Sequence, residues 1–75
     1  MIEYAVTSIL AELSATTRAA KKLCLVRWNG AATKLDLRQW MFDENGGAKP
    51  GKGVTLTDEE AHTLLEALQT YFSGE

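Results

Sequence analysis

The sequence has few of the residues that give small proteins extra stability. Its 75 residues include one cysteine and one histidine. A single cysteine excludes an internal disulfide, and one Cys with one His falls short of the about four ligands of a structural zinc site. Because a chain of this length has a small hydrophobic core, a partner chain remains as the usual source of further stability. We therefore predict a single domain over residues 1–75 that forms a homodimer.

Long hydrophobic runs are also absent. No apolar stretch approaches the roughly 20 residues of a membrane-spanning helix. The opening MIEYAVTSILAELS lacks a basic leader region and carries Glu3 and Glu12, which argues against a secretory signal. The lone thiol of Cys24 suits a reducing compartment. We therefore predict a cytoplasmic protein without membrane association.

Chemical motifs are few, and none indicates catalysis. Residues 46–53, GGAKPGKG, nearly match a phosphate-binding P-loop, but a glycine stands where Ser or Thr would hold Mg²⁺. Asp58, His62 and Glu66 have the four-residue spacing of helical metal ligands, which is equally typical of a solvated helix face. Cys24 has no neighbouring base and is expected to be a buried structural thiol. We predict no enzyme activity, no metal site, no cofactor and no small-molecule substrate.

The net charge of −2 conceals a separation of charge along the chain. Residues 18–52 hold all eight basic side chains and three acidic ones, a net charge of +5, whereas residues 53–75 carry −5. Because salt screens charges beyond about 8 Å, a polyanion at the middle segment would be attracted despite the acidic remainder. Such asymmetry is typical of nucleic-acid-binding proteins, although solvated strands with clustered charges would show it equally. The basic residues are Arg18, Lys21, Lys22, Arg27, Lys34, Arg38, Lys49 and Lys52.

The C-terminal segment predicts a helix over residues 58–73. Thr57 and Glu60 match a capping box, acidic residues follow the expected helix start, and Gly74 would end the helix. An apolar stripe recurs at the spacing of an amphipathic helix. It comprises Ala61, Leu64, Leu65, Leu68 and Phe72.

The middle of the chain predicts strands over residues 23–28, 33–42 and 53–57. The first is apolar and ends at Asn29-Gly30, a strong hairpin signal. Residues 43–53 are rich in turn-forming residues and predict a long flexible loop, in which two lysines flank a Pro-Gly turn.

Alternation in residues 33–42 assigns the side chains to two faces. Leu35, Leu37 and Met41 are expected to face the core, together with Val54 and Leu56 of the following strand. The opposite face is expected to be exposed and carries Lys34, Asp36, Arg38 and Trp40.

Residues 2–22 are ambiguous by pattern alone. IEYAVTSIL alternates like a strand, whereas ILAELSATTRAAKKL has the alanine content of a helix. Three threonines favour a strand over residues 3–13, followed by a loop.

Basic and aromatic residues are interleaved in the middle segment. Proteins that bind single-stranded nucleic acid use cations to contact phosphates and aromatic rings to stack on bases. The alternatives are that Trp40 packs at a dimer contact and that the lysine-bearing loop is merely solvated. Trp28 points away from Arg27 in a regular strand, so both reach one ligand only through a bulge. The candidate nucleic-acid-binding residues are Lys21, Lys22, Arg27, Trp28, Lys34, Arg38, Trp40, Lys49 and Lys52.

Residues 34–60, KLDLRQWMFDENGGAKPGKGVTLTDEE, resemble the C-terminal domain of the transcriptional coactivator positive cofactor four, and most of all its small bacterial YdbC-like homologues. The shared pattern is a Leu-Asp-Leu-Arg strand, an acidic turn, Lys-Pro-Gly, Lys-Gly, a short strand and a capped helix. RWNG at residues 27–30 also resembles the bacterial members. The sequence departs from the family where Trp40-Met41 replaces a Tyr-Trp pair and where the Lys-Gly loop is one residue shorter.

The resemblance implies an α+β fold of four antiparallel strands and one C-terminal helix (β-β-β-β-α), in a symmetric homodimer that binds single-stranded DNA. It implies that Arg38, Lys49 and Lys52 contact the DNA backbone and that Trp40 contacts a base; Lys21 and Lys22 are included for their charge alone. The predicted function is single-stranded DNA binding with little sequence specificity, in transcription regulation or DNA maintenance, with RNA binding left open. The alternative is a protein–protein adaptor dimer in transcription whose basic face is solvated.

Overall fold

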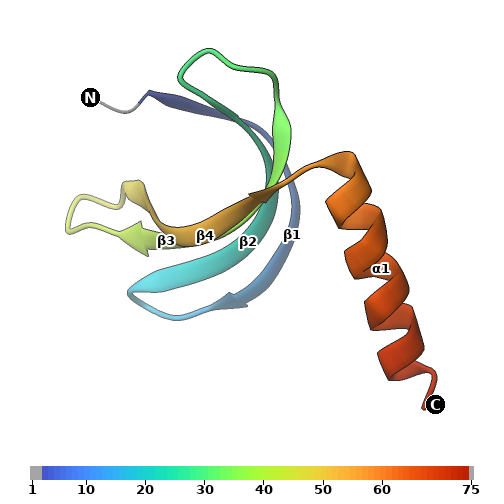
Figure 1. The fold of residues 1–75 in the computed structure, drawn as a ribbon. Helices are drawn as coiled ribbons and strands as arrows, with labels where there is room; N and C mark the ends of the chain where they lie inside the picture. Colours follow the sequence, from blue (N-terminus) through green and yellow to red (C-terminus); the bar gives the residue numbers. More distant parts are fainter. Residues whose placement is uncertain (1–2, 75) are drawn as a thin grey trace.

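The computed structural model describes residues 3–74 as four strands followed by one helix (Figure 1). The strands form one antiparallel sheet in the order β1-β2-β3-β4. This arrangement confirms the predicted α+β class and the β-β-β-β-α order. Within the described residues, no helix is long and apolar enough to cross a membrane. The elements are β1 (Tyr4–Ala15), β2 (Ala19–Trp28), β3 (Lys34–Phe42), β4 (Ala48–Leu56) and α1 (Asp58–Phe72).

The sheet bends strongly, and α1 lies outside the bend (Figure 1). Three register shifts interrupt the pairing of β1 with β2, and such bulges bend a strand and increase its twist. On the inside of the bend, the Tyr4 hydroxyl donates to the Ala48 carbonyl oxygen at 3.4 Å, so the two edge strands approach each other across the hollow. The sheet therefore has a concave face and a convex face.

Strand pairing shows which residues share each face. Cys24 lies opposite Asp36 and Leu23 lies opposite Leu37, so residues of the same parity in β2 and β3 lie on one face. The odd-numbered leucines of β2 and β3 lie on the convex face. There, Leu35 and the helix residue Leu65 line the same shallow pocket. The concave face carries Ala20, Lys22, Cys24, Val26, Trp28, Lys34, Asp36, Arg38 and Trp40.

The helix agrees closely with its prediction. Thr57 accepts a hydrogen bond from the Glu60 backbone N–H at 3.1 Å, and the Glu60 carboxylate accepts one from the Thr57 N–H at 2.9 Å. This capping box fixes the start of the helix at Asp58. Gly74, at φ +83°, follows the C-cap residue Ser73, as expected for a residue that ends a helix.

The predicted loop before residue 23 is too long. Strand β2 begins at Ala19, so the segment that carries Lys21 and Lys22 belongs to the sheet. The turn before it is short because the Thr16 hydroxyl accepts hydrogen bonds from the backbone N–H groups of Arg18 and Ala19, at 3.2 and 3.1 Å.

The predicted loop over residues 43–53 is also wrong in its second half, because β4 begins at Ala48. A proline is tolerated there since β4 is an edge strand with a bulge opposite Gln39. Gly53 allows β4 to approach β3 closely, because a Cβ at this position would lie 2.5 Å from the Leu37 backbone oxygen. The Pro-Gly and Lys-Gly pairs therefore mark a bulged strand, and Lys52 lies on that strand.

The alternation of β3 is confirmed, but its assignment to inside and outside is reversed. Asp36 is fully buried and Trp40 is only 4% exposed, although both were expected to face solvent. Val54, expected to point inward, is 53% exposed. The bend explains this, because it encloses the concave side chains, whereas α1 covers only part of the convex face.

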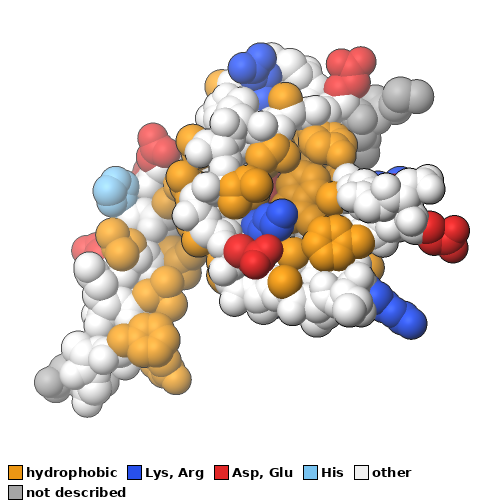
Figure 2. Space-filling view, turned by 180° about the vertical axis from the view of Figure 1, so that it is seen from behind, with side chains coloured by type: hydrophobic (Ala, Val, Ile, Leu, Met, Phe, Trp, Pro, Cys, Tyr) orange, Lys and Arg blue, Asp and Glu red, His pale blue; other side chains and the backbone are white. Residues whose placement is uncertain are grey.

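The buried core of the described residues is small. Within residues 3–74, α1 has no buried side chain. Figure 2 shows hydrophobic side chains gathered in the hollow of the sheet and others along the helix. The buried apolar residues are Ala19, Ala20, Cys24, Val26 and Trp40.

Candidate nucleic-acid interface

A buried ion pair occupies the concave face. The Asp36 carboxylate is fully buried and accepts two hydrogen bonds from Arg38, from Nε at 2.9 Å and from Nη2 at 3.0 Å. Trp28 Nε1 donates to it at 3.1 Å, and the Thr55 hydroxyl donates at 3.3 Å. Four donors thus replace the water that a buried carboxylate loses, and the bidentate geometry is the strong form of this pair.

The same contacts fix the Arg38 side chain. Its Nη1 donates to the Gly51 carbonyl oxygen at 2.8 Å, and its guanidinium carbon lies 4.8 Å from the centre of the Trp28 ring. The side chain is 15% exposed. The expectation of a free, solvent-exposed arginine is therefore wrong, because its charge is paired with Asp36 and three of its five N–H donors are engaged, two by Asp36 and one by Gly51. Its predicted phosphate contact stays a prediction.

Aromatic rings line the concave face beside this pair. The Tyr4 ring centre lies 5.6 Å from the centres of both Trp28 and Trp40, with tilted rings. Trp40 is enclosed, Trp28 is partly buried, and Tyr4 is 40% exposed. Tyr4 is the aromatic residue that the sequence analysis missed. The alternation of residues 2–10 suggested a strand but assigned Tyr4 to no face, and the pairing of Tyr4 with Trp28 places it on the concave face.

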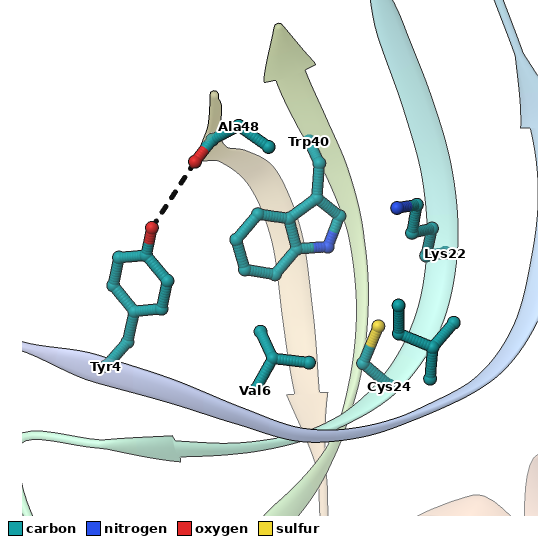
Figure 3. Close-up of a pocket in the computed structure, with 7 residues that line it drawn as sticks. Tyr4, Val6, Lys22, Cys24, Trp40 and Ala48 are labelled. Carbon is teal, nitrogen blue, oxygen red and sulfur yellow. Dashed lines mark hydrogen bonds between the residues drawn. The ribbon is translucent and has the colours of Figure 1, made fainter. Parts of the chain in front are cut away.

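A cavity of about 230 Å³ opens within the concave face (Figure 3). Burial raises the pKa of the Cys24 thiol, the positive charge of Lys22 opposes this rise, and Asp36 adds to it. Cys24 is buried, as predicted. Among residues 3–74, the buried Trp40 Nε1 has no hydrogen-bond partner. The cavity is lined by Tyr4, Val6, Ile9, Lys22, Cys24, Trp40 and Ala48.

The nine candidate residues fall on both faces of the sheet. Lys21 and Lys52 line a shallow groove on the convex side together with Val54. Lys49 lies opposite Met41, which also belongs to the convex side, and Arg27 lines a separate pocket near the start of β1. The concave face brings together Lys22, Trp28, Lys34, Arg38 and Trp40.

Comparison with known proteins gives two findings. The family model described as "Transcriptional Coactivator p15 (PC4)" matches residues 15–67, which is more than half of the chain. The chain is also similar to an uncharacterized protein of Treponema pallidum, at 42% identity over 45 residues. That match covers 60% of this chain and 49% of the relative, so the chain matches about half of the relative's length. The narrower likeness to YdbC-like homologues stays a prediction. The matched segment runs from the end of β1 through most of α1, and the chain therefore belongs to the PC4 family of transcriptional coactivators.

Proposed function

We propose that this protein binds single-stranded nucleic acid, DNA first of all, on the concave face of its sheet. Family membership supports nucleic-acid binding and transcription coactivation in general. The observation that carries the finer proposal is the half-exposed Tyr4 ring, which adjoins two tryptophans and basic side chains of the same face. Bases stack on such rings while cations contact phosphates. A duplex hides its base faces and is bound less well by this surface.

The basic residues of the concave face have different roles in this proposal. Lys22 and Lys34 supply positive charge that attracts phosphates, and neither makes an ion pair within the described residues. Glu12 lies opposite Lys22 in the β1–β2 pairing and reduces the local charge. Arg38 holds the Trp28 ring and Asp36 in place, so its contribution is mainly positional.

The test compares lysines on the two faces. Labelled oligo-dT and a duplex of equal length are titrated at two salt concentrations with the wild type, Lys22→Met and Lys49→Met. Log affinity for the single strand should fall with log salt by about 0.7 per neutralised phosphate, and Lys22→Met should flatten this slope. Lys49→Met is the matched control on the convex side. An equal loss in both variants would mean that DNA also contacts Lys49, as the family resemblance implies.

The proposal includes a homodimer formed through the convex face and α1. Leu64, Leu65 and Leu68 are exposed along the helix, and Tyr71 and Phe72 are more exposed still. An apolar surface of this kind on a chain with so small a core favours association with a second copy. Sedimentation at micromolar concentration should show a dimer. A single species of 8.2 kDa would contradict the proposal.

A second candidate function is an adaptor dimer in transcription that does not bind nucleic acid. The exposed aromatic pair at the end of α1, Tyr71 and Phe72, favours it, because their rings lie 4.8 Å apart and could contact another protein. The oligo-dT titration separates the two functions, since an adaptor gives no salt-dependent binding. Absence of catalysis and a cytoplasmic location stay predictions.

A further inference from the structure

We propose that the cavity of the concave face is a subsite for one nucleobase. The subsite selects bases with a carbonyl oxygen at the thymine O4 or guanine O6 position (thymine, uracil and guanine) over adenine, which has an amino group there. The inference deepens the proposed function and rests on it. It assigns to Trp40 the role of a hydrogen-bond donor within the cavity, whereas the sequence predicted an exposed stacking ring.

The indole N–H of Trp40 is the observation from which this follows. Its side chain is 96% buried, and within residues 3–74 its Nε1 finds no acceptor. Buried donors in native proteins nearly always have a partner, so an unpaired one points to a ligand or an ordered solvent molecule. The chain offers its own comparison, because the other indole, that of Trp28, donates to Asp36 at 3.1 Å.

The surroundings of this N–H define the chemistry of the ligand. Trp40 lines the cavity together with Lys22, and Figure 3 shows the indole nitrogen on the side of the ring that faces Lys22 and Cys24. Both Trp40 and Lys22 are donors without acceptor capacity. A ligand atom between them must therefore accept hydrogen bonds, and a carbonyl oxygen with two lone pairs fits both.

Base chemistry then gives a preference. Thymine O4 and guanine O6 are carbonyl acceptors, whereas adenine presents its N7 acceptor beside an amino group. That amino group would place donors against Lys22 and Trp40. Of the carboxylates on this face, Glu12 lies opposite Lys22, and Asp36 already accepts four hydrogen bonds. The cavity volume of about 230 Å³ lies below the roughly 300 Å³ at which drug-sized ligand sites begin, which suits a single base. The half-exposed Tyr4 ring lies at the same cavity and can stack on that base.

The first test measures base preference by titration of equal-length oligo-dT, oligo-dU and oligo-dA. The wild type should bind oligo-dT and oligo-dU about tenfold more tightly than oligo-dA, which is the discrimination expected from one base-specific contact. Trp40→Phe keeps an aromatic ring and removes the N–H, so the ratio of its affinities for oligo-dT and oligo-dA should fall from about tenfold to near one, whatever its overall affinity. Self-stacking of oligo-dA cannot produce this difference, because it is the same for both proteins.

The second test needs no variant. In ¹⁵N–¹H spectra of the wild type, the Trp40 indole resonance should move on addition of oligo-dT, and the Trp28 resonance, already bonded to Asp36, should move much less. Binding of oligo-dT and oligo-dA with equal affinity, or an unmoved Trp40 resonance in a saturated complex, would overturn the base subsite and leave the proposed function intact. If no oligonucleotide binds at low salt, the proposed function itself fails.

Discussion

The Asp36–Arg38 pair is the most informative place to perturb this fold. Arg38→Met keeps much of the volume of the side chain and removes its charge. It removes two of the four hydrogen bonds that the buried carboxylate accepts, and also the bond to the Gly51 oxygen. Asp36 would then be a fully buried anion with only Trp28 and Thr55 as donors.

The expected loss of stability is large for a chain of this size. Breaking a buried ion pair by removing one partner costs about 3–5 kcal/mol, chiefly because the other charge is left uncompensated. A protein of 75 residues has an unfolding free energy of about 4–11 kcal/mol. Arg38→Met should therefore lose about half of the stability. The measurement is urea unfolding followed by tryptophan fluorescence, at one fixed protein concentration because association contributes to stability.

A double-mutant cycle separates the pair from the loss of packing. The double variant Asp36→Leu with Arg38→Met removes both charges, so it should be more stable than the sum of the two single losses predicts, by more than about 1 kcal/mol. Additive losses, or an Arg38→Met loss below about 1 kcal/mol, would refute the view that this pair is coupled and buried. The cycle also bears on binding experiments, because a weaker DNA affinity of an Arg38 variant has meaning only if that variant is folded.

Three further perturbations test separate features. Gly53→Ala should cost about 2 kcal/mol in urea unfolding, because the added Cβ would lie 2.5 Å from a backbone oxygen of β3; a loss near zero would mean that the strands separate freely. Thr57→Ala should cost about 1 kcal/mol of stability through loss of the helix cap. The control is Thr63→Ala, at an exposed position within the helix that is not a cap, and it should change stability much less. Equal effects would contradict the role of the cap. The folded-state pKa of Cys24 is raised by burial, so the folded protein retains the thiol proton where the unfolded chain loses it. Below the pKa of an ordinary thiol, this group should therefore leave the unfolding free energy unchanged. As pH rises through that value toward the folded pKa, the unfolding free energy should decrease. The measurement is the unfolding free energy of the wild type minus that of Cys24→Ala, followed against pH. An increase in that difference with pH would refute the sign.

Local sequence signals predicted the elements whose ends are set by local chemistry. The capping box at Thr57 and the turn at Asn29-Gly30 act within a few residues, and both lie where they were expected. The Asn29 backbone at φ +52° and Gly30 at φ +77° have the left-handed conformations that such a hairpin turn requires. These features depend little on the rest of the molecule.

The second half of the 43–53 segment could not be predicted in the same way. Proline and glycine usually mark turns, but at the edge of a sheet they also permit a bulge and close strand approach. Which role applies depends on the neighbouring strand. Gly53 lies opposite Arg38, and its missing side chain leaves room for the β3 backbone. The sequence of residues 43–53 does not itself indicate that β3 lies beside this segment.

Burial of β3 depends on shape as well as on pattern. Period-two alternation separated the Leu35 and Leu37 face from the Asp36, Arg38 and Trp40 face, and the strand pairing confirms that separation. The apolar face was expected to be the buried one. The bend of the sheet instead encloses the polar and aromatic face, where Asp36 finds four donors. The Asp36, Arg38 and Trp40 face looks polar in the sequence, because the donors that bury the carboxylate come partly from other strands. Period-two alternation therefore does not identify it as a core face.

This reversal connects the two surfaces of the molecule. The convex face keeps the leucines of a conventional core, yet α1 contributes no buried side chain to cover them. A second copy placed against that face would supply the missing layer and give the leucines the burial that their pattern predicts. It would also leave each concave face, with Tyr4, Lys22 and the unpaired Trp40 N–H, open toward solvent. Under the proposed function, dimer formation and nucleic-acid binding would therefore use opposite faces of one sheet, and neither would compete with the other for surface.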